Sequence, residues 1–164
     1  MLVLATLHRL LSQVISSPGL HTAVILTPKG QLVSYACDST RTKDDVRLVV
    51  GLSSEIWLEV ADQGIGMVDS ELGRILVVGV QDSVVTTRAG TDLSPSSSAN
   101  AGHPSDNPLM LVALSATEAV GWEDLEAKAI ELTEHLSLPV SRLRKPLAAT
   151  YASTPSPPAT RHGR

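Results

Sequence analysis

The sequence contains no phenylalanine, and aromatic residues make up only 2% of its 164 residues. A buried core must therefore be built from valine, leucine, isoleucine and alanine, which favours β-branched strands and aliphatic helix faces. The only cysteine is Cys37, which excludes an intramolecular disulfide. No secretory pattern of a basic region, an apolar segment and a cleavage site opens the chain, so we expect a reducing, intracellular compartment.

Long hydrophobic runs and lipid-attachment motifs are also missing. No apolar run approaches the roughly 20 residues that span a bilayer. Leu2 stands where myristoylation needs glycine, and the C-terminal HGR has no cysteine for prenylation. Any association with a membrane is therefore expected to come through a partner, without direct insertion.

Basic residues are scarce in the first 141 positions, which contain all 17 acidic residues but only eight of the 13 basic ones. The resulting net charge of −9 opposes binding to a phosphate backbone, so we expect no nucleic-acid partner. The other five basic residues lie in a proline-rich C-terminal segment. There a solvated, disordered tail at 145–164 is favoured over a site for acidic partners.

Motifs for catalysis or ligand binding are also lacking. The GIG segment at 64–66 follows a predicted helix and has neither the third glycine nor the Lys-Ser/Thr step of a phosphate loop, so it is interpreted as a helix-ending loop. The five histidines lack metal-ligand spacing, and Cys37 has no identifiable activating base. Acidic pairs at 44–45 and 123–124 stand at predicted helix starts, where negative charge stabilises the helix dipole. We therefore predict that the chain is not an enzyme and has no catalytic residues, metal or cofactor.

Apolar periodicity predicts three helices and five strands in one domain. Strands at 21–26 and 31–36 form a hairpin, because Pro28 presets the turn and Gly30 accepts a positive φ. The other strands are expected at 74–80, 83–89 and 109–115, and the helices at 4–15, 43–62 and 122–138, with one further turn at 140–143. This α-β-β-α-β-β-β-α order predicts an α/β protein of the α+β type, in which helices cover both faces of a mainly antiparallel, five-stranded sheet. The domain is expected to span 1–144, with a flexible insertion at 90–108 that is rich in Ser, Pro, Gly and Asn.

The 43–62 helix and the 74–80 strand are the features that point to a partner. The helix carries an apolar stripe wider than one buried face requires, and Gly51, Ser53 and Ser54 would let another helix approach closely. The strand contains the uncharged run ILVVGV, which would invite aggregation as a free sheet edge. A partner strand would remove that hazard, so we expect function to lie in surfaces.

Two tryptophans have the largest apolar areas in the chain. Trp57 lies on the wide helix and Trp122 opens the last helix. Each is a candidate either for a partner anchor or for a core residue.

The order of elements and several local sequences resemble the Roadblock family of dynein-light-chain-like domains. Within that family the likeness is greatest to the small Roadblock-type subunit of the Ragulator complex, an adaptor of late endosomes and lysosomes. The glycine–tryptophan step at 121–122 and the SEIW segment at 54–57 favour that subunit. The matching passages are LSQVI at 11–15, TAVILTPKGQLVSYA at 22–36, SSEIWLEVADQG at 53–64, DSELGRILVVGV at 69–80, SVVTTRA at 83–89 and EAVGWEDLEAKAIELTEHLSLPVSRL at 118–143. The insertion at 90–108 and the long basic tail depart from the family pattern.

The resemblance implies a heterodimer with a second Roadblock domain. In such domains the third strand pairs with the same strand of the partner, and the second helices pack beside each other. Carried onto this sequence, the resemblance implies pairing through the 74–80 strand and packing through the 43–62 helix. The implied interface residues are Val46, Val49, Val50, Ser53, Trp57, Val60, Arg74, Ile75, Leu76, Val77, Val78 and Val80.

The resemblance also implies a role as a scaffold. The other Ragulator subunits would be partners, and the complex would hold Rag-type GTPases on the late endosomal, lysosomal or vacuolar membrane through a lipid-anchored partner. It would so support activation of TOR complex 1 by nutrients.

Two alternatives remain open on the same fold. A Roadblock-type dynein light chain would bind the intermediate chain of a motor instead. A subunit of a small-GTPase activator complex would supply a group such as Arg74 or Arg88, although both lie within predicted strands and an arginine finger stands on an exposed loop.

Overall fold

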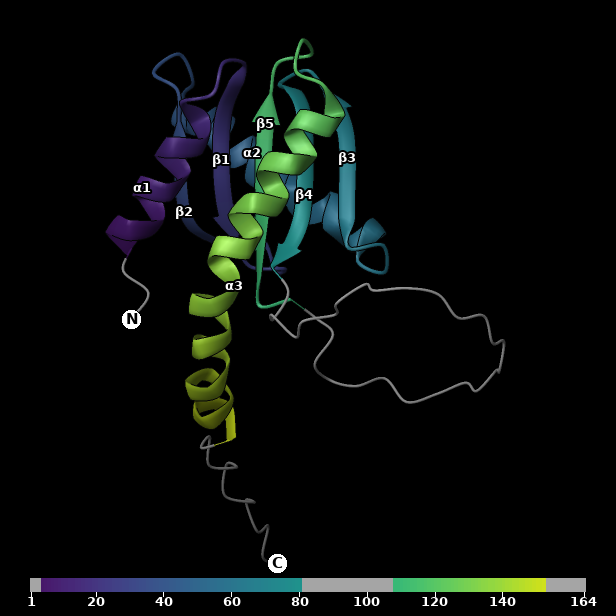
Figure 1. Cartoon of the computed structure of the whole chain (residues 1–164). Coiled ribbons are helices and arrows are strands. Elements are labelled where there is room, and N and C mark those ends of the chain that lie inside the picture. The colour runs from purple at the N-terminus through teal and green to yellow at the C-terminus, as the bar shows by residue number, and fades with distance from the viewer. Residues whose placement is uncertain (1–3, 81–107, 153–164) are drawn as a thin grey trace, which may run out of the picture.

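The computed structural model describes residues 4–80 and 108–152, which form a three-layer α+β domain (Figure 1). The five-stranded sheet is antiparallel throughout and has the strand order β2-β1-β5-β4-β3. Helix α2 covers one face of the sheet, and helices α1 and α3 lie side by side on the other. The elements are α1 (Leu4–Ile15), β1 (Leu20–Leu26), β2 (Leu32–Cys37), α2 (Lys43–Val60), β3 (Ile65–Ser70), β4 (Gly73–Val80), β5 (Met110–Ala116) and α3 (Trp122–Ala152). This arrangement confirms the predicted fold class and the predicted order of elements.

Alternation along the central strands divides the core into two clusters, one on each face of the sheet. Toward α2, Val24 of β1 and Val77 of β4 pack with Trp57 of the helix. Toward α1 and α3, Leu114 of β5 packs with leucines of both helices. Trp57 is therefore a core residue of this chain, with 3% of its surface exposed.

The first hairpin follows the predicted turn chemistry. The Gly30 N–H donates to the Thr27 carbonyl at 2.9 Å, and Gly30 has a φ of 79°. A side chain at that φ would be strained, so glycine is the residue that lets β2 turn back onto β1.

Local signals also set both ends of α2. The Asp45 N–H donates to Thr42 Oγ1 at 3.2 Å and the Thr42 N–H donates to Asp45 Oδ2 at 2.9 Å, which is a capping box. At the other end, the Gly64 N–H donates to the Val60 carbonyl at 3.1 Å with a φ of 79° at Gly64. The glycine therefore reverses the chain into β3 instead of into a loop.

The identity of the third strand corrects the sequence prediction. The third strand is β3, the segment that the sequence suggested was a helix-ending loop, and the 74–80 run is the fourth strand. Gly66 lies in β3 where an added Cβ would stand 2.5 Å from Ile56 Cγ2, so the glycine lets α2 pack directly on the strand. A two-residue turn after Ser70 then returns the chain into β4. The strand predicted at 83–89 lies outside the described residues, as does all but the last residue of the predicted insertion.

Helix α3 is longer than predicted. It continues through Pro139 and Pro146 to Ala152, and its last turns extend past the end of the sheet (Figure 1). Pro139 removes one backbone hydrogen bond, but Val140 is 1% exposed and packs in the same core cluster as Leu136. Burial of Val140 stabilises the helix just beyond Pro139. Because α3 continues to Ala152, the prediction of disorder from residue 145 is wrong for 145–152.

Candidate interaction surface

Strand β3 is an edge of the sheet that no helix or strand of residues 4–80 and 108–152 covers. Within the described chain it pairs with β4 alone, from Ile65 opposite Val78 to Ser70 opposite Gly73. Its sequence IGMVDS has no lysine or proline, and its one charge, Asp69, accepts a hydrogen bond from Arg74 Nε at 3.3 Å. The outer backbone groups of β3 are therefore a template for another strand.

The side chains at the middle of β3 are apolar and exposed. Met67 is 40% exposed and Val68 is 38% exposed. Because neighbours on a strand point to opposite faces, Val68 lies on the same face as Gly66, toward α2, and Met67 lies on the face of α3. A strand added at this edge would meet an apolar side chain on each face.

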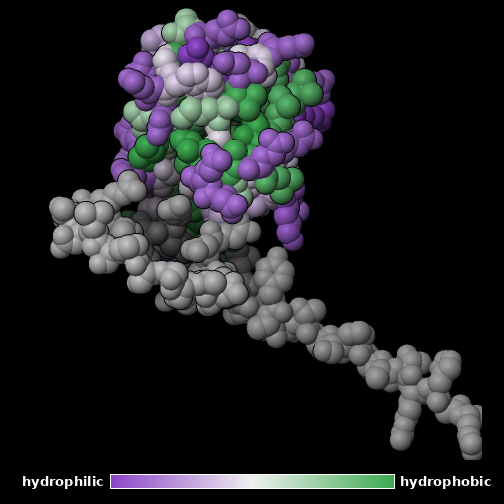
Figure 2. Space-filling view, turned by 90° about the vertical axis from the view of Figure 1, so that its right-hand side faces the viewer, coloured by the Kyte–Doolittle hydropathy of each residue, from purple (hydrophilic) through white to green (hydrophobic). Residues whose placement is uncertain are grey.

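The outer face of α2 continues this apolar surface. Leu58 is 76% exposed and Leu48 is 56% exposed, whereas Val49 and Trp57 on the inner face are buried. Gly51 lies between the two leucines, and an added Cβ there would have no heavy atom within 4 Å. Figure 2 looks onto the β3 side and shows apolar surface gathered between hydrophilic areas where β3 and α2 meet. We call Leu48, Leu58, Met67 and Val68 the edge patch.

The predicted interface residues lie elsewhere. None of the twelve is exposed: seven are buried in the two clusters of the core, Ser53 is a buried polar residue, and Val50, Val60, Arg74 and Val78 are half-buried. The prediction that the 74–80 strand is the pairing edge is wrong, because β4 is hydrogen-bonded to β3 on one side and to β5 on the other. That α2 takes part in the dimer interface stays a prediction, but the residues involved would lie on its outer face.

A signal for two residues of the edge patch was present in the sequence. Leu48, Leu52 and Leu58 widen the apolar stripe beyond one face, and two of them are now seen to be exposed. No comparable signal marked Met67 and Val68, since a short strand after a glycine has little periodicity of its own.

Arg74 is held inside the domain. Its Nη1 donates to the Val120 carbonyl at 2.6 Å, and its guanidinium lies 4.9 Å from the ring centre of Trp122. These contacts join the start of β4 to the start of α3 and are typical of a structural cation–π pair. Arg74 is therefore unsuited to reach into a GTPase, and Arg88 lies outside the described residues.

A buried polar cluster lies at the end of the sheet beside β3. His21 is 6% exposed, Arg41 Nη2 donates to its Nε2 at 3.1 Å, and Arg41 also donates to the Leu72 carbonyl at 3.2 Å. Burial is the main cause that holds the pKa of His21 below its ordinary value, and the positive charge of Arg41 is the second cause. The neutral imidazole thus accepts a hydrogen bond that ties the loop before α2 to β1, and the bond from Arg41 to Leu72 ties the same loop to the β3–β4 turn.

Metal clusters and membrane spans are absent from the part of the chain that the structure describes. It contains no group of three His, Cys, Asp or Glu side chains placed to hold a metal ion. None of its helices is long and apolar enough to cross a membrane.

No protein-family model and no curated protein matches the sequence. Solved structures match the fold at low sequence identity. A Roadblock/LC7 domain from Streptomyces avermitilis is 13% identical with a TM-score of 0.53, over 79% of this chain and 92% of that one. MglB in a tetrameric arrangement is 11% identical with a TM-score of 0.55, over 85% and 90%. The gliding protein MglB from Thermus thermophilus is 12% identical with a TM-score of 0.51, over 82% and 87%. The chain therefore has the Roadblock/LC7 fold.

Proposed function

We propose that this chain is a non-enzymatic adaptor that pairs with a second Roadblock domain through β3 and the outer face of α2. The observation that carries the proposal is a sheet edge that the described residues leave unpaired, lying beside exposed leucines on the adjoining helix. A sheet edge alone, or single exposed leucines alone, would be common features of a protein surface. Together they place exposed apolar side chains of β3 and α2 beside backbone donors and acceptors that no other described strand pairs with.

Pairing would use both the backbone groups of β3 and the exposed leucines of α2. A partner strand would satisfy the outer N–H and C=O groups of β3 and extend the sheet into the partner. The partner's second helix would then lie against the outer face of α2, with Gly51 at the point of closest approach between Leu48 and Leu58. Burying an exposed leucine contributes about 1.5–3 kcal/mol at most, so the two leucines stabilise the pair substantially.

For the cellular role, we propose a subunit of a Ragulator-like complex. In that role the heterodimer holds Rag-type GTPases at the late endosomal, lysosomal or vacuolar membrane and supports activation of TOR complex 1 by nutrients. The support is the sequence resemblance along residues 11–143 and an architecture in which the accessible apolar surface suits assembly. The lipid anchor belongs to another subunit in this proposal.

Co-expression with candidate Roadblock domains tests the proposal. We expect the chain to co-purify with one of them, and light scattering to give the mass of a 1:1 pair. Mass spectrometry of the complex from cells should then recover further Ragulator-type subunits. A stable monomer that none of these domains binds would disprove pairing, and recovery of a motor intermediate chain instead would replace the Ragulator role with that of a dynein light chain.

A GTP-hydrolysis assay distinguishes the proposed adaptor from the remaining alternative, a subunit of a small-GTPase activator complex. Because the Arg74 guanidinium is engaged with Val120, Asp69 and Trp122, we expect the chain to leave the rate of hydrolysis by a Rag-type GTPase unchanged. A rate increase that an Arg88→Ala variant abolishes would favour a GTPase activator.

A further inference from the structure

A groove separates α1 from α3 on the face of the sheet opposite α2. One cavity of about 220 Å³ lies between Leu10, Gln13, Val14 and Ser17 of the α1 side and Lys128, Glu131, Leu132 and His135 of α3. A second cavity of about 570 Å³ adjoins it toward the start of α3. Both cavities are lined by Ser17, Lys128 and Glu131, so they form one continuous groove.

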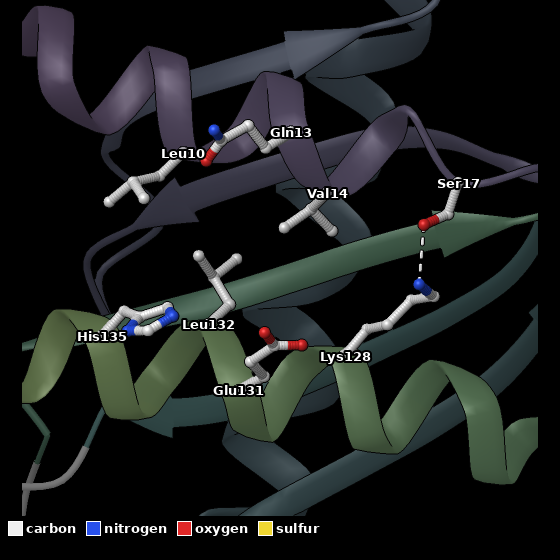
Figure 3. A pocket seen from close by; sticks show the side chains of 8 residues that line it. All are labelled: Leu10, Gln13, Val14, Ser17, Lys128, Glu131, Leu132 and His135. Carbon is white, nitrogen blue, oxygen red and sulfur yellow. Dashed lines mark hydrogen bonds between the residues drawn. The ribbon is translucent and has the colours of Figure 1, made fainter.

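The floor of the groove is apolar. In Figure 3, Val14 points down from α1 and Leu132 points up from α3 into the space between the helices. Leu10 and Val14 are half-buried and Leu132 is 2% exposed, and all three belong to or pack on the core cluster of this face. Val120 and Leu20 extend the apolar lining into the second cavity.

Two carboxylates along the groove form no ion pair with a described side chain. Asp124 and Glu131 are exposed, and neither forms an ion pair with any residue whose side chain the structure describes. They are seven residues apart on α3, which places them about two turns or 10 Å apart on the same side of the helix. Lys128, between them, reaches across to Ser17, where its Nζ donates to Oγ at 2.6 Å (Figure 3).

From these observations we infer that the groove binds a basic amphipathic helix of a partner protein. The lining residues repeat at three- and four-residue spacing on both α1 and α3, so a third helix can lie along the groove with its apolar side on Val14 and Leu132. Lysine or arginine at two positions seven residues apart on that helix would stand opposite Asp124 and Glu131. An acidic helix would instead bring like charges together.

This site is separate from the edge patch. The groove lies on the α1 and α3 face, whereas β3 and α2 lie at the far edge and on the other face (Figure 1). Binding of the basic helix therefore neither requires nor blocks pairing through β3. The two proposals fail independently.

A pair of synthetic peptides tests the inference on the full-length chain. The probe is a fluorescein-labelled helix of about 18 residues, or five turns, with a leucine stripe and two lysines seven residues apart beside it. Its counterpart has glutamate in place of both lysines. By fluorescence anisotropy we expect the lysine peptide to bind about tenfold more tightly than the glutamate peptide.

Charge reversal on α3 then locates the contact. Glu131→Arg should weaken binding of the lysine peptide about tenfold, whereas Glu134→Arg, an equal charge change at an exposed position outside the groove, should change it less than about twofold. Amide shifts in NMR spectra should change along α1 and α3. No binding of the lysine peptide, equal binding of the two peptides, equal losses in the two variants, or shifts confined to α2 and β3 would each overturn the inference.

Discussion

The two edge strands of the sheet, β2 and β3, differ in how far the rest of the described chain covers them. Along β2, helix α1 packs beside the strand, and Nδ1 of His8 donates a hydrogen bond to the Tyr35 carbonyl at 2.8 Å. Along β3, the described chain supplies no cover, and Met67 and Val68 stand exposed. Within the described residues the chain thus protects one edge with its own helix and leaves the other open, which is why we propose β3 as the pairing edge.

A lysine placed on each edge gives the sharpest test of that contrast. Val68 of β3 and Leu32 of β2 are similarly exposed, at 38% and 44%. Because β3 is the proposed pairing edge, Val68→Lys should weaken binding to the partner Roadblock domain about 100-fold, or about 2.7 kcal/mol. Leu32→Lys should change it less than about twofold. Isothermal titration calorimetry measures both affinities, and a larger loss for Leu32→Lys would reverse the assignment of the edges.

The outer face of α2 should contribute less than the strand. Leu58→Glu places a charge at the most exposed large apolar residue of the helix and should weaken pairing about tenfold. It should leave the thermal unfolding midpoint of the isolated chain unchanged within a few degrees, because the side chain packs on nothing. The matched control is Lys43→Glu at the exposed start of the helix, which should preserve affinity. Normal pairing of Leu58→Glu would confine the interface to β3.

Removing the cover from β2 should have a smaller effect on stability. His8→Ala deletes the hydrogen bond to Tyr35 and should lower the free energy of unfolding by about 0.5–1.5 kcal/mol. Urea denaturation measures this loss. Hydrogen exchange should also become faster in β2 but not in β3, and unchanged exchange in β2 would show that the histidine does not protect this edge.

A pH change should loosen the β3 side selectively. The pKa of His21 is lower in the folded chain than its ordinary value of 6.5, so the folded state binds fewer protons than the unfolded state. The stabilisation is therefore present above about pH 6.5 and is lost as the pH falls below that value toward the folded pKa. Protonation also places a second positive charge beside Arg41, which should speed hydrogen exchange at the β3–β4 turn.

The control for this effect keeps a neutral side chain. His21→Gln should remove the pH dependence between pH 7 and pH 5 while Asp45, whose pKa is lowered by its hydrogen bonds to Thr42, titrates at more acidic pH. A pH profile identical to that of the unaltered chain would show that another group is responsible.

Much of the fold followed from local chemistry in the sequence. The hairpin around Gly30 and the start of α2 at Thr42 are specified by turn and capping residues, so their positions were predicted closely. Strand β3 was missed because its glycine works through tertiary packing: Gly66 makes room for Ile56 and Val60, which local patterns do not show. The unbroken course of α3 through Pro139 was missed for the same reason, since burial of Val140 outweighs the local cost of proline.

The candidate surface was harder to predict than the fold. The sequence correctly marks α2 as too apolar for one buried face, but composition does not say which residues the sheet will cover. Once β4 takes a central position, its apolar run needs no partner, and the free edge passes to the less apolar β3. Which strand lies at the edge is decided by pairing order, a non-local property.

The open edge at β3 also has a consequence for how much of this protein a cell contains. A copy made without its partner would present unpaired backbone and the edge patch to chaperones and proteases for as long as it stays single. Its steady-state abundance would then be set by the synthesis of the partner more than by its own. Under the proposed pairing, one uncovered strand would thus link the stoichiometry of two gene products.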